Sequence, residues 1–342
     1  MATKLLTIRV GREGEPMQLK LSRKPVLIIL ALLIVTLVAS LVFFLLSINR
    51  PSTSDRKKGK GFEYLFSIYG FGQKIDELLS QPNGIAVGKN RYVYVTDQDN
   101  NRIVVFDKDG KFLFKFGKKG GGRGAFQAPM GIAVSPKGLV YVTDRLQGKV
   151  LIFDLKGKFI KEFKVDAPLM PAVTSDKLYI TTSGHVMIYD LEGKLLAKWG
   201  KKGRQKGEFD FPNGIAVGED GTVFVADSNN FRIQALDPKG KVLWAAGGPT
   251  SDPKGEKRRF GLPVSLSIDE DGVLYLVDAF PGSIRVLSSN GVEFAELGEY
   301  GRDDGQLNHP AQMTYGGNRV FYIADKFNDR VQAIKIPSYA QE

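Results

Sequence analysis

The sequence contains no cysteine and only two histidines among its 342 residues. The absence of cysteine excludes a disulfide framework and any cysteine-ligated metal site within this chain. His185 and His309 are too few to form a three-histidine zinc site. Chemistry that depends on a thiolate or on several imidazoles is therefore excluded.

Acidic residues are scarce in the first 60 positions, which hold 11 Lys and Arg against 3 Asp and Glu. The rest of the chain holds 37 basic and 34 acidic residues, so most of the formal net charge of +11 belongs to the N-terminal segment. A nucleic-acid-binding protein usually carries its basic excess on a face of its folded domain. We therefore expect no nucleic-acid partner.

Charge is absent from residues 26–48, a run of 23 mainly apolar residues. At about 1.5 Å per residue, a helix of this length crosses a hydrocarbon core of roughly 30 Å. The run exceeds the ~7–15 apolar residues of a cleaved signal peptide, and no typical small-residue cleavage site follows it. We therefore predict one uncleaved transmembrane helix that contacts the lipid bilayer through residues 26–48.

Basic residues flank this predicted helix almost evenly, with six before it and five after it. The positive-inside rule therefore hardly decides its orientation. Because a first apolar segment commonly acts as a signal anchor, we expect a single-pass protein of the cell membrane. Its N-terminus would be cytoplasmic and its main domain extracytoplasmic.

A repeated unit follows the predicted helix, and a proline opens each of its six copies at intervals of 39 to 51 residues. Each copy starts with a short apolar strand, as at 84–87, and in five copies a second strand ends at an acid, as at 93–97. A third strand, a tight turn and a fourth strand complete the pattern. Four strands in each of six units predict an all-β, six-bladed propeller, because one unit cannot bury its apolar faces alone. The opening prolines are Pro82, Pro129, Pro168, Pro212, Pro263 and Pro310.

The first unit reads Pro-Asn-Gly-Ile-Ala-Val at 82–87, Val-Tyr-Val-Thr-Asp at 93–97, Asn-Asn-Arg-Ile at 100–103 and Asp-Lys-Asp-Gly-Lys at 107–111. This pattern resembles the NHL repeat, and the resemblance covers about residues 82–336. It is strongest in units 1, 2 and 4. The resemblance implies a propeller whose loops recognise a protein, or in some cases a carbohydrate or RNA. NHL-like lyases with histidine metal ligands are a poorer match, because this chain has two histidines.

The sixth unit lacks a fourth strand, because it ends after its third strand at Ile336 and Pro337. Residues 62–69 precede Gly70 and resemble the fourth strands of the other units. We predict that they complete the last blade and close the ring. The predicted order is a tail at 1–24, a transmembrane helix at 25–48, a linker at 49–61, the propeller at 62–337 and a tail at 338–342.

Two sets of loops are expected on one face, those between the second and third strands and those between blades, because neighbouring strands in a blade are antiparallel. Varied loops on a rigid scaffold commonly carry binding sites. Three blade-to-blade loops are basic, whereas the loop at 298–309 is acidic. We expect the basic loops to bind a protein with an anionic surface; ordinary solvated loops are the alternative. The candidate binding residues are Lys118, Lys119, Arg123, Lys201, Lys202, Arg204, Lys206, Arg258, Arg259 and His309.

An acid at the end of the second strand is followed five residues later by a cation in four units. An ion pair that fixes the short loop between them is the simplest interpretation, and a ring of ligand contacts is the alternative. Unit 3 lacks both members, whereas Asp278 of unit 5 has no cation at the matching position, Ser283. The four pairs are Asp97 and Arg102, Asp144 and Lys149, Asp227 and Arg232, and Asp325 and Arg330.

No nucleophile or cluster of metal ligands accompanies the two histidines in the sequence, so we predict a binding or scaffolding module without catalytic residues or a cofactor. The sequence leaves open a calcium ion on the axis, bound by carbonyl groups or Asp side chains. A lyase or hydrolase with a site on the axis is the second hypothesis, with His309 as the conceivable acid–base group. A sensor that acts through a cytoplasmic partner is the third.

Overall fold

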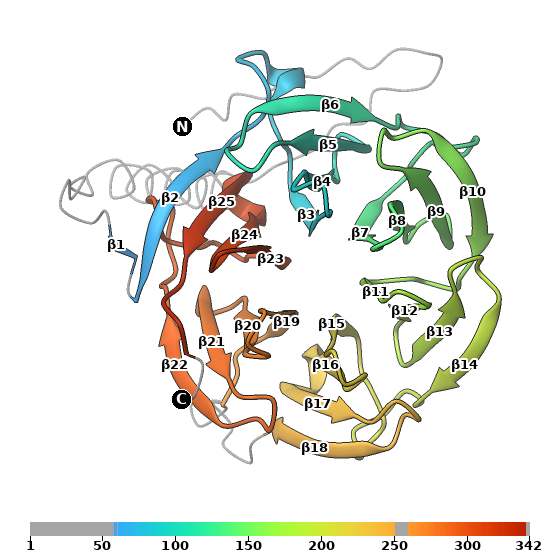
Figure 1. The fold of residues 1–342 in the computed structure, drawn as a ribbon, viewed down its shortest axis with the longest axis vertical. Helices are drawn as coiled ribbons and strands as arrows, with labels where there is room; N and C mark the ends of the chain where they lie inside the picture. Colours follow the sequence, from blue (N-terminus) through green and yellow to red (C-terminus); the bar gives the residue numbers. More distant parts are fainter. Residues whose placement is uncertain (1–57, 60, 250–258, 340–342) are drawn as a thin grey trace, which may run out of the picture. The chain divides into compact units, whose positions relative to one another are not determined.

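The computed structural model describes residues 58–59, 61–249 and 259–339. In this part of the chain, six antiparallel sheets surround a central opening (Figure 1). This arrangement confirms the predicted all-β, six-bladed propeller. No helix among the described residues is long and apolar enough to cross a bilayer, and the span predicted at 26–48 lies outside them.

Each blade begins with its innermost strand, and each later strand lies further from the axis (Figure 1). Blades 1 to 3 consist of β3 (Pro82–Val87), β4 (Val93–Asp97), β5 (Arg102–Phe106) and β6 (Phe112–Phe116); β7 (Pro129–Val134), β8 (Leu139–Asp144), β9 (Lys149–Asp154) and β10 (Phe159–Lys164); and β11 (Pro171–Val173), β12 (Lys177–Thr181), β13 (Val186–Asp190) and β14 (Leu195–Trp199).

Blades 4 and 5 consist of β15 (Pro212–Val217), β16 (Val223–Asp227), β17 (Arg232–Leu236) and β18 (Val242–Gly247), and of β19 (Pro263–Ile268), β20 (Leu274–Asp278), β21 (Ser283–Leu287) and β22 (Glu293–Leu297). Blade 6 contains β23 (Met313–Gly317), β24 (Val320–Asp325) and β25 (Arg330–Lys335), followed outward by β2 (Phe62–Ile68) and β1 (Lys58–Gly59). Three single-turn helices lie in loops: η1 (Ile75–Glu77), η2 (Ser228–Asn230) and η3 (Lys326–Asn328).

The ring closes through segments from the two ends of the described chain. Strand β2 pairs antiparallel with β25, with Ile68 opposite Val331 and Tyr64 opposite Ile334. Figure 1 shows the two strands side by side although more than 260 residues separate them in the sequence. The segment expected to complete the last blade therefore occupies the fourth-strand position of the sixth sheet. The short strand β1 adds a fifth position outside it.

The hydrophobic core lies between blades and not within them. In the described residues, each of six buried clusters combines side chains from two adjacent blades, as where Tyr94 and Ile103 of blade 1 meet Val140 and Phe153 of blade 2. The middle strands β4 and β5 are buried along their whole length. This arrangement explains why one unit cannot be stable alone and why neighbouring units must stack.

Hydrogen bonds from second strands also join neighbouring blades. The Tyr94 hydroxyl donates to the Leu155 carbonyl of the next blade over 2.9 Å, and the Tyr141 hydroxyl donates to the Leu191 carbonyl over 3.1 Å. The Thr96 hydroxyl similarly donates to the carbonyl of Met130 over 3.0 Å. The Tyr and Thr of the repeated Val-Tyr-Val-Thr-Asp sequence therefore fix the spacing between blades.

The turns between third and fourth strands use a repeated Asp and Gly. In the first of them, Asp107 Oδ1 accepts hydrogen bonds from the backbone N–H groups of Asp109 and Lys111, over 3.0 and 2.9 Å. Gly110 adopts a φ of +82°, a left-handed conformation that glycine takes without steric strain. The same carboxylate contacts recur at Asp154, Asp190 and Asp237. The Asp-Lys-Asp-Gly sequence is therefore a hairpin turn.

Candidate functional site

The loop face of the propeller is the end at which second and third strands are joined. The loops that lead from one blade to the next lie on this face too, because Asp97 Oδ1 at the end of β4 accepts the backbone N–H of Ser80 over 2.8 Å. Equivalent bonds of 2.7 Å run to Asp227 from the N–H of Asp210 and to Asp325 from the N–H of Asn308. The opposite end, which carries the turns between third and fourth strands, is called the turn face.

A buried ion pair holds the loop face together in units 1, 4 and 6. The Nε to Oδ2 distances are 2.6 Å for Arg102–Asp97 and 2.8 Å for both Arg232–Asp227 and Arg330–Asp325. The remaining guanidinium N–H groups donate to carbonyl oxygens of the blade-to-blade loop, as from Arg232 to Arg204 and Gln205 over 2.7 and 2.8 Å. Each pair therefore fixes both the loop between its strands and the neighbouring blade-to-blade loop.

The electrostatics of these pairs follow from their burial. Burial raises the pKa of Asp325, while the Asn308 N–H and the Arg330 guanidinium act against this rise. Burial lowers the pKa of Arg330, but the attraction of Asp325 outweighs it and leaves the pKa raised. A buried charge without its partner is strongly unfavourable. The two side chains therefore bond to each other and to backbone groups. This is the pattern of an ion pair that stabilises the fold.

The pair predicted in unit 2 was wrong. Lys149 Nζ lies 2.5 Å from Glu162 Oε1 on the neighbouring strand β10, because the lysine side chain extends across the sheet. Asp144 instead accepts hydrogen bonds from the backbone N–H of Gln127 over 2.7 Å and from the Gln147 side chain over 2.9 Å. The carboxylate thus keeps its position with amide donors replacing the guanidinium.

Unit 5 supplies a cation that the five-residue spacing does not find. Arg285, seven residues after Asp278, places its Nη2 3.8 Å from Asp278 Oδ2 and its Nη1 3.1 Å from Glu293 Oε1. The seventh residue after the acid lies on the same side of the third strand as the fifth residue, since side chains alternate in a strand. In units 4 and 6 the matching residues Gln234 and Gln332 donate to Asp227 and Asp325.

Two cations, one of them from a predicted basic loop, meet over a single aromatic ring on the loop face. The Lys202 ammonium and the Arg145 guanidinium lie 5.8 and 5.6 Å from the centroid of the Phe211 ring. Lys201 pairs with Glu208 over 3.2 Å while most of its side chain remains exposed. Arg145, which comes from the loop between β8 and β9, was missed by the sequence reasoning. Its contact with Phe211 joins residues of different repeat units, which a local sequence pattern does not contain.

Other candidate residues do not converge with this group. Arg123 lies 5.5 Å over the ring of Phe159, the first residue of the outer strand β10. Arg259 pairs with Glu293 over 3.1 Å and donates to the Gly291 carbonyl, which places its guanidinium near the turn face. Both depart from the predicted loop-face cluster because their long side chains lie along an outer strand. Lys118, Lys119, Arg204 and Lys206 are exposed, and Arg258 lies outside the described residues.

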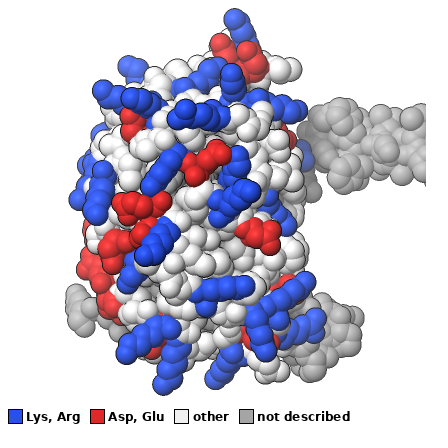
Figure 2. Space-filling model, turned by 90° about the vertical axis from the view of Figure 1, so that its right-hand side faces the viewer, with Lys and Arg blue, Asp and Glu red and all other residues white. Residues whose placement is uncertain are grey.

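The basic side chains of the propeller are also spread over its side. Figure 2 shows Lys and Arg on the side that includes β10 and β14, with Asp and Glu and uncharged surface between them. No continuous basic surface of the kind that tracks a nucleic-acid backbone is visible in this view. The convergence at Phe211 is therefore a local feature of the loop face.

His309 lies on the loop face among aromatic side chains. Its ring centroid is 4.7 Å from that of Phe327 and 6.0 Å from that of Tyr300, and its Nδ1 is 3.0 Å from Asn308 Oδ1. Its φ of +48° is shared by Phe211 and closely matched by Gln81, which also precede prolines, so this backbone conformation belongs to the repeat. Among the described residues, His309 therefore contacts three aromatic rings and the Asn308 amide, and it has no carboxylate partner.

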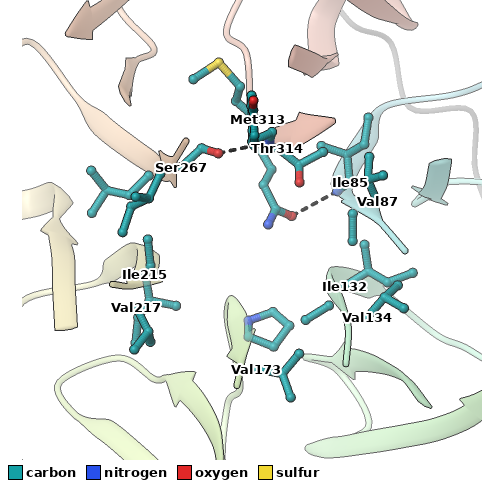
Figure 3. Close-up of a pocket in the computed structure, with 18 residues that line it drawn as sticks. Ile85, Val87, Ile132, Val134, Val173, Ile215, Val217, Ser267, Met313 and Thr314 are labelled. Carbon is teal, nitrogen blue, oxygen red and sulfur yellow. Dashed lines mark hydrogen bonds between the residues drawn. The ribbon is translucent and has the colours of Figure 1, made fainter. Parts of the chain in front are cut away.

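The axial opening contains a pocket of about 310 Å³ lined by the innermost strands. Figure 3 shows apolar side chains such as Ile85, Ile132 and Ile215 around this opening. Two hydrogen bonds cross between its walls: the Ile85 N–H donates to Gln312 Oε1 over 2.9 Å, and the Tyr315 N–H donates to Ser267 Oγ over 3.0 Å. No Asp, Glu, His, Lys or Arg lines this pocket, and no group of three potential metal ligands is found among the described residues.

Comparison with known families agrees with the repeat pattern. Residues 74–179 match a family model described as a 6-bladed beta-propeller, and residues 209–236 match the NHL repeat model. Protein lin-41 of Caenorhabditis elegans is 37% identical over 70 residues, which is 19% of this chain and 6% of that protein. Protein SUPPRESSOR OF QUENCHING 1, chloroplastic, of Arabidopsis thaliana is 27% identical over 194 residues, which is 47% of this chain and 18% of that protein. The chain therefore matches only a small part of these relatives.

Solved structures share the fold at low sequence identity. A streptogramin B lyase superimposes with a TM-score of 0.58 and 17% identity, covering 81% of this chain and 98% of the lyase. Hydrazine synthase of Kuenenia stuttgartiensis superimposes with a TM-score of 0.55 and 14% identity, covering 80% of this chain and 99% of that chain. At these identities the likeness concerns the fold alone. The described residues thus form a six-bladed β-propeller whose sequence matches the NHL repeat model at residues 209–236.

Proposed function

We propose that this protein is a membrane-anchored binding module whose extracytoplasmic propeller recognises an anionic protein surface through its loop face. The observation that carries the proposal is the convergence of Arg145 and Lys202 over the Phe211 ring, at 5.6 and 5.8 Å. The two cations come from different blades, and both are exposed. A lysine of an ordinary solvated loop does not share an aromatic ring with a second cation.

Preorganisation makes this pair of cations suitable for binding. Lys202 belongs to the loop at 200–211, which Arg232 fixes through the carbonyls of Arg204, Gln205 and Glu208. Arg145 follows Asp144, whose carboxylate is held by backbone amides. Because the loops are already ordered, binding costs less conformational entropy. Complementary charge then sets the orientation of the partner and speeds its association.

An enzyme with an axial site is supported less well. The axial pocket is lined mainly by Ile, Val and Ala side chains. Its polar members are Gln312, Ser267, Thr314 and Tyr315, and no carboxylate, imidazole or ammonium group is among the lining residues. The streptogramin B lyase resembles this chain in fold only. A binding module needs no such groups, and its partner contacts can all lie on the loop face.

A charge-reversal experiment tests the proposal. The full chain carrying Arg145→Glu and Lys202→Glu should lose at least about tenfold in capture of its partner from solubilised membranes, since each good charge contact contributes about 1 kcal/mol or more. The matched control is Lys156→Glu with Lys194→Glu, which makes the same change in charge at exposed lysines of the turn face. Capture that is equal in both variants would show that the convergent pair is not the site.

The membrane assignment has its own test. Protease added to intact cells should remove the propeller and leave the N-terminal tail protected. Protection of the propeller with loss of the tail would reverse the orientation, and recovery of the whole chain in a soluble fraction would exclude the anchor.

A further inference from the structure

Four aromatic side chains meet on the loop face between blades 5 and 6. The ring of His309 lies 4.7, 6.0 and 6.1 Å from those of Phe327, Tyr300 and Phe280, measured between centroids. Phe280 comes from the loop between β20 and β21, Tyr300 and His309 from the loop between β22 and β23, and Phe327 from η3. Three loops of two blades thus contribute to one group, which is called the aromatic cluster.

The aromatic cluster is exposed to solvent. Phe280, Tyr300 and Phe327 leave 55%, 54% and 52% of their surface accessible. Single exposed apolar residues are common on proteins, whereas contiguous exposed apolar surface with a polar rim marks interaction sites. The three half-exposed rings all contact one histidine, so they form contiguous exposed apolar surface of the kind that marks an interaction site.

The repeats provide an internal comparison that separates the demands of the fold from those of a ligand. The loops at 200–211 and 298–309 have the same backbone pairing, with parallel bridges between Lys202 and Phe209 and between Tyr300 and Leu307. Lys202 therefore occupies the position of Tyr300. Because the same loop conformation forms with lysine there, the fold does not require Tyr300.

The same comparison applies to Phe327. Its backbone N–H donates to the Asn308 carbonyl over 3.1 Å, and the N–H of Asn229 donates to the Asp210 carbonyl over 3.1 Å at the matching place in blade 4. Asn229 therefore occupies the position of Phe327. The loop of blade 4 forms with an exposed asparagine at this position. Folding therefore does not require the phenylalanine in blade 6.

Charge around the aromatic cluster is negative, in contrast to blade 4. The loops that carry Tyr300, His309 and Phe327 hold four carboxylates against two cations, Arg302 and Lys326. Burial lowers the pKa of Lys326, whose ammonium donates to Gln98 Oε1 over 3.3 Å. The matching loops of blade 4 hold four cations against two carboxylates. Of the carboxylates in the loops of the aromatic cluster, Asp304 lies 3.6 Å from the Arg330 guanidinium and Asp329 accepts the Gln81 N–H over 2.7 Å. The four carboxylates of these loops are Glu299, Asp303, Asp304 and Asp329.

We propose that the aromatic cluster binds a basic peptide segment of a partner protein. A Lys or Arg side chain would rest against the exposed faces of Tyr300 and Phe327, because aromatic faces attract cations. Further cations of the peptide would face the surrounding carboxylates. This site is separate from the cations at Phe211 and has the opposite charge preference. A single partner with one acidic and one basic region would then be held in one orientation.

The test measures binding of a fluorescein-labelled peptide of alternating arginine and glycine to the full chain in detergent micelles. The key variant is Tyr300→Lys with Phe327→Asn, which installs the residues that blade 4 carries at the same positions. Its dissociation constant for the peptide should rise about tenfold or more, since loss of two cation–aromatic contacts removes on the order of 1–2 kcal/mol. Phe327→Asn alone changes no charge and should weaken binding about threefold.

Leu146→Asn is the control variant. Leu146 is 72% exposed in the loop between β8 and β9, away from the aromatic cluster, and its replacement should leave peptide affinity unchanged. All variants should keep the melting temperature of the parent, because the substituted residues are exposed. Arginine–glycine peptide affinity that is unchanged in the double variant would overturn the proposal. Equal binding of a glutamate–glycine peptide would also overturn it.

Two further outcomes would assign the aromatic cluster to a different occupant and so overturn the proposal. One is specific binding of a neutral oligosaccharide such as chitohexaose, sensitive to Phe327→Asn, without peptide binding. The other is self-association in light scattering that is lost in the double variant, again without peptide binding. Charge reversal at Arg145 and Lys202 should not affect peptide affinity, so failure here is distinguishable from failure of the proposed anionic partner.

Discussion

The hydroxyl of Tyr322 in the last blade donates a hydrogen bond of 2.7 Å to the backbone carbonyl of Lys108 in the first blade. This is the same contact that Tyr94 and Tyr141 make between earlier neighbours, here made across the point where the ring closes. Burial raises the pKa of Tyr322 to about 12, so the hydroxyl remains a donor at physiological pH. The closure therefore relies on a side chain of the repeat as well as on strand pairing.

Replacement of Tyr322 by phenylalanine should lower the free energy of unfolding by about 1 kcal/mol, because it removes one hydrogen bond and leaves the Lys108 carbonyl without this donor. Urea unfolding of the full chain in detergent, followed by tryptophan fluorescence, measures the change. Tyr300→Phe, at a half-exposed ring, is the control and should change stability by less than about 0.5 kcal/mol. Equal stability of Tyr322→Phe and the parent would contradict the closure role.

Deletion of residues 61–70 should destabilise the propeller much more strongly. The deletion removes β2 and exposes the edge of β25, together with apolar surface around Ile68 and Val331. An unpaired edge and an open core favour aggregation and loss of cooperative unfolding. The melting temperature should fall by more than about 8 °C, which corresponds to a loss of several kcal/mol for a domain of this size. A variant that melts at the parent temperature would show that ring closure does not depend on β2.

Most of the fold could be predicted from the repeated sequence pattern. Apolar strands ending at Asp97, Asp227 and Asp325 recur at intervals that only a propeller accommodates, so the blades could be counted in advance. Exact strand starts were less accessible. Pro168 and Pro310 open their units in the sequence, but β11 begins at Pro171 and β23 at Met313. In these units the residues before the first strand still bond to the second strand, as from the Leu169 N–H to the Thr181 carbonyl over 2.8 Å, but they lie outside the regular strand pairing.

The candidate site was less predictable because it depends on contacts between units. Spacing alone paired Asp144 with Lys149, but Glu162 on the adjacent strand competes for the lysine. Arg145 reaches Phe211 past blade 3, and a local pattern cannot contain such a contact. One feature of the sequence does indicate the aromatic cluster. Tyr300 and Phe327 occupy the positions at which the loops of blade 4 have Lys202 and Asn229. Alignment of the repeats position by position would have found it.

His185 should contribute to the pH dependence of stability. Burial, and secondarily the charge of Lys198, lower its pKa in the folded protein. Below the unfolded pKa of about 6.5, the unfolded chain binds the proton more readily, so the free energy of unfolding falls with decreasing pH until the folded pKa is passed. His185→Gln should show a shallower fall over this window in urea titrations at several pH values. Identical slopes in the two proteins would exclude this contribution.

The difference between a buried and a partly exposed ion pair can be measured with two matched substitutions. Arg330→Met leaves Asp325 buried without its guanidinium and removes hydrogen bonds to the carbonyls of Asp303 and Gln306, so it should cost about 3–5 kcal/mol. Lys149→Met breaks a pair whose members are 22% and 29% exposed and should cost less than about 1 kcal/mol. Both replacements keep an unbranched apolar side chain, so urea unfolding compares the charges directly. Similar losses in both variants would mean that burial does not set the strength of these pairs, and the loop face would then have to be held mainly by its backbone hydrogen bonds.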